Sequence, residues 1–174
     1  ADQLSRLAVR PNSACLKKLI ENFGKSILTP EDQLDRKIFR SLIFSSPEKR
    51  RLAESIIHPH IYDELIKNLT SHYKNSKPKD LWFYEASLIY EVKIENLFRE
   101  IWVTHCGYKE QLKRLLKREH MSKIYAKHIL NSQLPPDIKK QNADFVIDTT
   151  ISVEDSLQSV EQHLLTFPVS DKEK

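Results

Sequence analysis

The sequence predicts an α/β protein built around a parallel sheet. Three short runs rich in strand-forming residues, at 81–90, 99–107 and 144–150, are separated by longer segments with helical periodicity. Strands that alternate with helices are typical of a parallel sheet, because parallel neighbours need a crossover connection. The 174 residues are enough for one core, or for one core and a smaller helical part.

The first half of the chain is predicted to be mostly helical. Apolar residues within 16–23 keep the spacing of a helix face, and Gly24 follows where a left-handed C-terminal cap is expected. Two further helices are predicted on either side of a serine pair, with Ser46 as N-cap and Pro47 in the first helical position. Pro59 is expected to kink or restart the second of these helices.

The last predicted helix follows the third strand run. It begins at Ser152, with Asp155 at capping-box spacing, and is expected to bury Leu157, Val160 and Leu164. Residues 167–174 are expected to be a C-terminal tail, frayed over "SDKEK" at 170–174.

Composition excludes several classes of protein. The net charge of +4 is modest, no apolar run approaches the ~20 residues of a membrane span, and no signal peptide is visible. Cys15 and Cys106 are far apart and form no CxxC pair, which favours a reducing compartment over a disulfide framework. We therefore expect a cytoplasmic protein without a membrane or nucleic-acid partner.

Glycine is scarce, and this limits nucleotide binding. Gly24 and Gly107 are the only glycines, so the chain contains neither a GxxxxGK[ST] phosphate loop nor a GxGxxG turn. Charge is distributed unevenly: residues 109–140 hold nine Lys or Arg and three acidic residues, a net +6. This segment is the basic pole of the sequence.

An ordered set of short motifs resembles dephospho-coenzyme A (dephospho-CoA) kinases from residue 1 to about residue 166. The motifs, in order, are "ADQLSR" at 1–6, "FG" at 23–24, "LDR" at 34–36, "IF" at 43–44, "HP" at 58–59, "SLIYE" at 87–91, "QLKRLLKRE" at 111–119 and "QLP...K....ADFVID" at 133–148. Each motif alone is weak, but their order and spacing are specific.

The resemblance implies a P-loop NTPase-like three-layer fold with a parallel sheet ordered 2-3-1-4-5, a helical acceptor-binding insert and a helical lid. It implies a nucleotide-binding core over residues 1–6, 80–107 and 133–166, a dephospho-CoA-binding domain over 7–79 and a lid over 108–132. The first motif matches from the middle of the family's Asp-x-Asp onward, so about thirty residues that carry the phosphate loop would precede it. We therefore expect a fragment that folds poorly and is inactive alone, because a missing middle strand leaves sheet edges unpaired.

The implied activity is transfer of the ATP γ-phosphoryl group to the ribose 3′-hydroxyl of dephospho-CoA, with Mg²⁺, in a monomer or a trimer. On the acceptor side, Asp2 would orient the hydroxyl and accept its proton, and Arg6 follows one helical turn later. His58, Leu88 and Glu91 match further acceptor-binding positions. A histidine pair at 58 and 60 does not suggest a metal site, because residues two apart on a helix point to different faces.

The nucleotide side of the implied site is basic. Arg114 and Arg118 match the arginines of the family's lid and lie four apart on one predicted helix, so both can face one ligand. A guanidinium can hold two phosphate oxygens at once and stays charged. Lys139 matches the lysine after the Gln-x-Pro element and is expected to help hold the nucleotide.

Several positions depart from the family's pattern. Ser87 stands in place of a proline and Glu85 in place of an aspartate, whereas Pro136 replaces a basic residue and Thr149 replaces an asparagine. These changes affect the expected adenine contacts and the fine geometry, and they indicate a divergent member.

Two other functions stay open at this point. One is another nucleoside or nucleotide kinase of the same fold, which the helical segment 7–79 disfavours. The other is a non-catalytic protein that uses the basic segment to bind nucleic acid or an acidic partner. Few aromatic residues alternate with the basic residues of 109–140, which disfavours stacking on bases.

Overall fold

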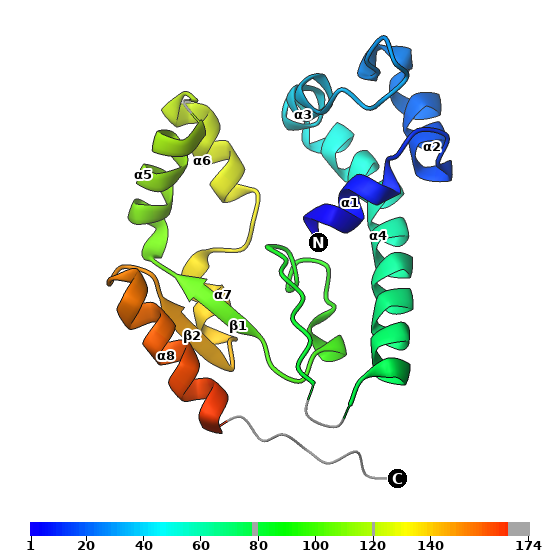
Figure 1. Ribbon diagram of the computed structural model, residues 1–174. Helices are drawn as coiled ribbons and strands as arrows, with labels where there is room; N and C mark the ends of the chain where they lie inside the picture. The colour runs from blue at the N-terminus through cyan, green and yellow to red at the C-terminus, as the bar shows by residue number, and fades with distance from the viewer. Residues whose placement is uncertain (78–79, 120, 167–174) are drawn as a thin grey trace. The chain divides into compact units, whose positions relative to one another are not determined.

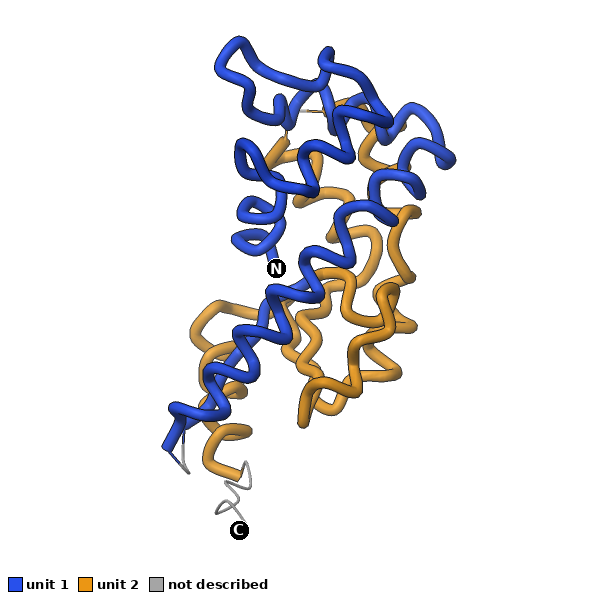
Figure 2. Tube along the Cα trace, turned by 90° about the vertical axis from the view of Figure 1, so that its right-hand side faces the viewer, with its two compact units in different colours: residues 1–86, 170–174 blue, residues 87–169 orange. Residues whose placement is uncertain are grey.

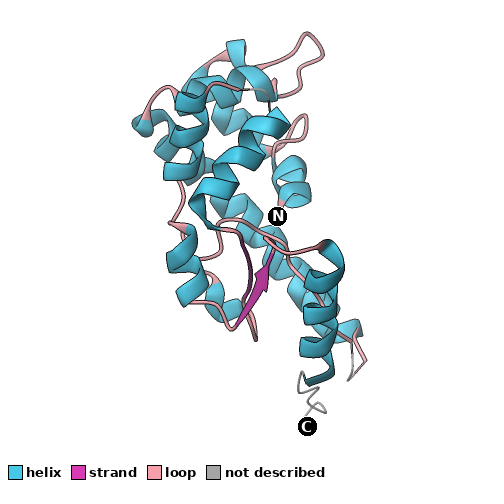
Figure 3. Cartoon of the chain, turned by 90° about the vertical axis from the view of Figure 1, so that its left-hand side faces the viewer, coloured by secondary structure: helices cyan, strands magenta, loops and turns pink. Residues whose placement is uncertain are grey.

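The computed structural model describes residues 1–77, 80–119 and 121–166. These residues form two compact units, residues 1–86 and residues 87–166, which Figure 2 shows in two colours. The first unit is helical, and the second contains the sheet (Figure 3).

The first unit packs three helices against a long fourth helix (Figure 1). Its elements are α1 (Asp2–Ala8), α2 (Ala14–Phe23), η1 (Lys25–Ile27), α3 (Arg36–Phe44) and α4 (Pro47–Asn75). The side chains of Leu19 and Ile27 are fully buried in the core, and the rings of Phe23 and Phe39 meet edge to face at 5.5 Å. Burial of apolar surface is therefore the main force that holds this unit together.

Helix α2 confirms the prediction of a capped helix over residues 16–23. The hydroxyl of Ser13 accepts a 3.1 Å hydrogen bond from the backbone N–H of Leu16. At the other end, the N–H of Gly24 donates to the carbonyl of Ile20, and Gly24 has φ +80°. Glycine suits this position because L side chains rarely adopt a positive φ.

Helix α4 begins as predicted. The hydroxyl of Ser46 caps it, and Pro47 is its first residue. Pro59 does not restart the helix, because α4 continues through it to Asn75. Proline inside a helix costs about 3 kcal/mol, and packing on both sides of Pro59 against the same core offsets this cost. The packed side chains are Ile56, Ile57 and Ile61.

The second unit contains two parallel strands joined by helices. Its elements are η2 (Glu95–Leu97), β1 (Trp102–His105), α5 (Gly107–Glu119), α6 (Lys123–Asn131), α7 (Pro136–Gln141), β2 (Phe145–Asp148) and α8 (Val153–Thr166). Strands β1 and β2 pair in parallel, with Trp102 opposite Phe145 and His105 opposite Asp148. The strands predicted within 99–107 and 144–150 are thus confirmed, with α5 to α7 as their crossover.

The strand predicted at 81–90 is wrong. Residues 81–86 have no regular secondary structure, and a turn covers 89–93. A strand exists only through hydrogen bonds to a neighbour, and among the described residues the only sheet is the pair β1 and β2. Trp82 instead packs its ring 5.3 Å from His72 of α4 and 5.9 Å from Tyr84. The five-strand order expected from the family is represented in the described residues by one parallel pair.

Helix α8 has the predicted cap. The hydroxyl of Ser152 accepts a 3.0 Å hydrogen bond from the N–H of Asp155 and donates a 2.7 Å bond to its carboxylate.

None of the helices in the described part of the chain has the length and apolar character needed to cross a membrane.

The burial predicted for α8 is only partly right. Val160 and Leu164 are half-buried, whereas Leu157 is 56% exposed. The helix contacts β2, and the ring of His163 stacks on that of Phe145 at 4.0 Å. Leu157 lies about 120° around the helix from His163, so it is outside this contact.

Candidate functional site at the carboxyl ends of the strands

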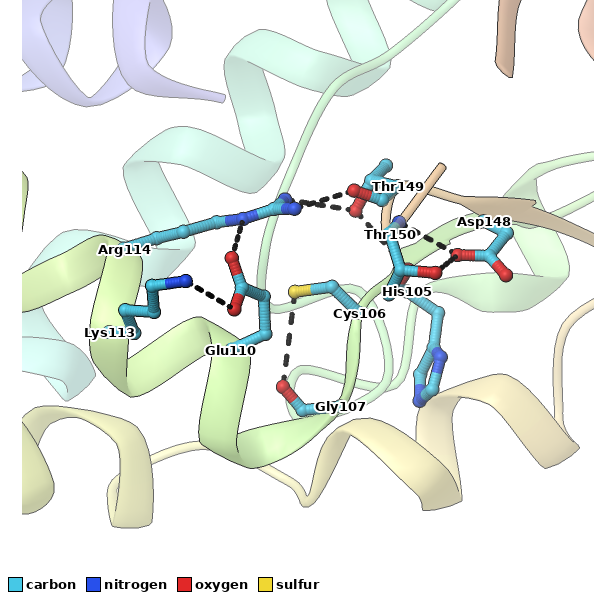
Figure 4. A network of polar contacts seen from close by, with 9 residues as sticks. All are labelled: His105, Cys106, Gly107, Glu110, Lys113, Arg114, Asp148, Thr149 and Thr150. Atoms are coloured by element: carbon cyan, nitrogen blue, oxygen red, sulfur yellow. Dashed lines mark hydrogen bonds and ion pairs between the residues drawn. The ribbon is translucent and has the colours of Figure 1, made fainter. Parts of the chain in front are cut away.

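The carboxyl ends of β1 and β2 lie side by side (Figure 4). His105 pairs with Asp148 in the sheet, and the N–H of Thr149 donates to the carbonyl of His105 at 2.9 Å. The hydroxyl and the N–H of Thr150 donate to Asp148 at 2.7 and 2.8 Å, and these bonds hold the pKa of Asp148 below its usual range. Ligands of open α/β sheets bind at this edge, so it is the candidate site.

Gly107 allows α5 to begin at this edge. It is the first residue of α5, two residues after β1 ends, and its φ is +69°. A side chain at this backbone angle would be strained. The tight turn brings the first turns of α5 next to the ends of the strands.

Arg114 reaches from α5 to the residue that follows β2. Its guanidinium donates to the carbonyl of Thr149 at 2.5 Å, to the hydroxyl of Thr149 at 3.1 Å and to the carboxylate of Glu110 at 3.0 Å. The bond from Arg114 lowers the pKa of Glu110. Figure 4 shows the guanidinium between α5 and Thr149, so Arg114 joins the predicted lid helix to the sheet.

Arg118 lies one turn further along α5. Its side chain is 74% exposed, and its Nε is 3.0 Å from the carboxylate of the adjacent Glu119. Exposed ion pairs contribute little free energy. The guanidinium of Arg118 can therefore exchange Glu119 for a ligand phosphate at small cost.

Lys139 and Glu91, which the sequence assigned to different ligands, form an ion pair. The Nζ of Lys139 is 2.7 Å from Oε1 of Glu91, and the two side chains are 15% and 19% exposed. Lys139 also donates to the carbonyl of Ser87 at 2.5 Å. Leu88, in the same segment as Glu91, is half-buried.

The remaining predicted site residues lie in the first unit. Asp2 and Arg6 are exposed on α1, in its first and last turns. Within the described residues they form no ion pair within 4.0 Å of each other, although they lie four residues apart. His58 is half-buried on α4, the helix that α1 contacts. The structure thus places Asp2, Arg6 and His58 in one unit and the other predicted site residues in the second.

Comparisons with known proteins decide the family. The family model described as dephospho-CoA kinase matches residues 1–155. Dephospho-CoA kinases of Carboxydothermus hydrogenoformans and Trichormus variabilis are each 34% identical to this chain over 92% of its length, which covers 77% and 80% of their own lengths. The chain belongs to the dephospho-CoA kinase family.

Solved structures agree with this family and with its fold. A dephospho-CoA kinase from Campylobacter jejuni is 28% identical, with a TM-score of 0.66 over 94% of this chain and 81% of that one. A protein from Thermus thermophilus, 22% identical, has a TM-score of 0.69 over 96% of this chain and 82% of its own, which shows a shared fold. The predicted α/β fold of the P-loop NTPase type is therefore confirmed.

The structure adds residues that the sequence did not single out in this dephospho-CoA kinase family member. Glu110 and Thr149 hold Arg114, and Asp137 lies 2.9 Å from Nε2 of His105. The four-residue spacing to Arg114 was a usable signal for Glu110. Thr149 stood out only as a departure from the family's asparagine. No residue near Asp137 in sequence indicates its contact with His105, which is 32 positions away.

Proposed function

We propose that this chain forms the acceptor-binding and lid parts of a dephospho-CoA kinase, which transfers the γ-phosphoryl group of ATP to the ribose 3′-hydroxyl of dephospho-CoA. The observation that carries the proposal is the family match over residues 1–155. Two arginines four apart on α5 support it, and the first of them, Arg114, contacts Thr149 directly after β2.

The acceptor side of the reaction rests on Asp2. Its carboxylate orients the 3′-hydroxyl and accepts the proton as the hydroxyl oxygen forms a bond to the γ-phosphorus. The bond from that phosphorus to the bridging oxygen breaks, and ADP leaves with the electron pair. Exposure of Asp2 leaves its carboxylate accessible to a substrate. Arg6 and His58 of the first unit, and Leu88 and Glu91 of the second, are the other residues that we propose contact the acceptor.

The nucleotide side rests on the lid helix α5. Arg118 binds the phosphates of ATP, where its charge offsets the negative charge that spreads over the transferred group. Arg114 holds α5 against Thr149 and so sets where Arg118 lies, which its two hydrogen bonds to Thr149 support. The sequence contains no glycine-rich phosphate loop, so these residues act on phosphates that are held elsewhere.

Mg²⁺ accompanies ATP in this proposal. Within the described residues, no three His, Cys, Asp or Glu side chains converge as a metal site. Such a cluster is not required, because Mg²⁺ that accompanies ATP is held by the nucleotide phosphates, waters and one or two carboxylates. We place the protein in the cytoplasm, because Cys15 and Cys106 are both free thiols.

The test is acceptor-dependent ADP release by the complete product of the natural gene. Dephospho-CoA is compared with AMP as acceptor, and the 174-residue chain, which has no phosphate loop of its own, is assayed beside it and is expected to be inactive. Asp2→Asn should lower kcat by about 10²-fold or more if the carboxylate is the base. Gln3→Ala, an exposed neighbour on α1, is the control. Turnover with AMP alone, or with neither acceptor, would refute the proposal.

A further inference from the structure

In the second unit, residues 87–91 are joined to residues 134–142 by a compact set of polar contacts. The contacts are Lys139 Nζ to Glu91 Oε1 at 2.7 Å, Lys139 Nζ to the Ser87 carbonyl at 2.5 Å, the Leu134 N–H to Glu91 Oε1 at 2.8 Å, and the Tyr90 hydroxyl to the Asn142 carbonyl at 2.7 Å. Each contact spans more than forty positions of sequence. They hold the turn that follows Ser87 against α7 and the residues that flank it.

Lys139 is engaged within the protein. Its ammonium group has three donors, and two acceptors of the turn already take up two of them. Its side chain is 15% exposed, whereas the next residue, Lys140, is exposed. A phosphate ligand would have to draw Lys139 away from both acceptors.

Glu91 makes such a movement costly. Its Oε2 is buried and, within the described residues, has no hydrogen-bond partner. Its Oε1 would keep only the N–H of Leu134 if Lys139 left. Removing one partner from a pair whose side chains are only 15% and 19% exposed leaves a charge without its partner, which is unfavourable.

We propose that Glu91 and Lys139 are a pair of positioning residues, which hold the turn after Ser87 against α7, and that Lys139 does not bind ATP. The inference rests on the proposed function, because this turn carries Leu88, which is proposed to contact the acceptor. Loss of either partner would displace this turn, and with it Leu88, which is proposed to contact dephospho-CoA. Arg118 on α5 would still reach the nucleotide.

Kinetics of the complete gene product separate this role from nucleotide binding. Glu91→Gln and Lys139→Met should each raise the KM for dephospho-CoA by roughly fivefold or more and change the KM for ATP by less than about twofold. The double variant should be no worse than the more impaired single variant, because both act through one contact. Lys139→Arg should retain most of the activity, and Lys140→Met is the matched control. A higher KM for ATP in Lys139→Met, or multiplicative effects of the two substitutions, would overturn the proposal.

A second measurement does not depend on activity. The protein is acetylated briefly with acetic anhydride without nucleotide, and the modified lysines are quantified by mass spectrometry. Lys139 should react roughly five times more slowly than Lys140, since its side chain is 15% exposed and its ammonium group donates to two acceptors of the turn. Glu91→Gln should remove most of this difference, and ATP should not protect Lys139 further.

The two measurements distinguish failure of the Glu91–Lys139 proposal from failure of the proposed function. Equal acetylation of Lys139 and Lys140 in the unmodified protein, or protection of Lys139 by ATP alone, would overturn the pair whether or not the protein is a kinase. A protected Lys139 in a protein that does not phosphorylate dephospho-CoA would refute the proposed function and the acceptor role, while the pair itself would stand.

Discussion

A stacked histidine joins α8 to the sheet, and we predict that His163→Ala destabilises the second unit. The ring of His163 lies 4.0 Å from that of Phe145, with the two planes 3° apart. Its Nε2 is 2.9 Å from Oε2 of Glu100, and both of these side chains are 22% exposed. The same carboxylate oxygen accepts a 2.8 Å hydrogen bond from the indole N–H of Trp102.

The magnitude follows from these contacts. An aromatic pair contributes about 0.5–1.5 kcal/mol beyond burial of its area, and a hydrogen bond contributes about 1 kcal/mol net. Glu100 keeps its bond from Trp102 in the variant, so the carboxylate is not left without a donor. The expected loss in the free energy of unfolding is therefore about 2 kcal/mol, or roughly a 30-fold change in the unfolding equilibrium.

The two tryptophans provide the assay, because the first unit contains Trp82 and the second contains Trp102. In a Trp82→Phe background, urea unfolding followed by the fluorescence of Trp102 reports the second unit. The midpoint for His163→Ala is compared with that for Gln158→Ala, an exposed position on the same helix. If the two variants unfold at the same urea concentration, the stacking and ion-pair argument is wrong.

Three further predictions concern charge and backbone. The hydrogen bonds from His163 and Trp102 hold the pKa of Glu100 below its usual range. The resulting stabilisation is present above the unfolded pKa of about 4.3 and is lost as the pH falls below it. Between about pH 5 and pH 3, the urea midpoint should therefore fall more steeply than in Glu100→Gln, and parallel curves would contradict this. Lys93 has φ +56°, so Lys93→Gly should raise the free energy of unfolding by about 1 kcal/mol, and a lower midpoint would argue against strain there. Arg118→Ala should raise the KM for ATP about tenfold, and an equal effect of Lys117→Ala, at an exposed position of the same helix, would show a general charge effect instead.

Features that depend on neighbouring residues in sequence were predictable. The caps at Ser46 and Ser152 and the glycine after α2 were identified correctly, because a cap needs only residues within about four positions of it. The strand predicted at 81–90 failed for the opposite reason. Apolar and aromatic composition indicates that a segment suits a sheet, but a strand forms only where another backbone pairs with it.

The same distinction applies to the candidate site. Helical spacing correctly placed Arg114 and Arg118 on one helix, and the family motifs singled out Glu91 and Lys139. The contacts that hold these side chains come from far along the chain: Thr149 is 35 positions from Arg114. A sequence pattern shows which residue types are present, whereas their partners follow from packing.

Two departures from the family pattern gain a physical explanation from these contacts. Thr149, in place of the family's asparagine, offers both its carbonyl and its hydroxyl to Arg114. Pro136, in place of a basic residue, is the first residue of α7, where a fixed φ favours helix initiation, and Lys139 follows within that short helix. The substitution at Thr149 therefore bears on how Arg114 is held, whereas the substitution at Pro136 removes one basic side chain and leaves Lys139 in the same short helix. We therefore expect this chain to differ from the family pattern in how the lid helix and the turn after Ser87 are held, and by the one basic side chain that Pro136 replaces.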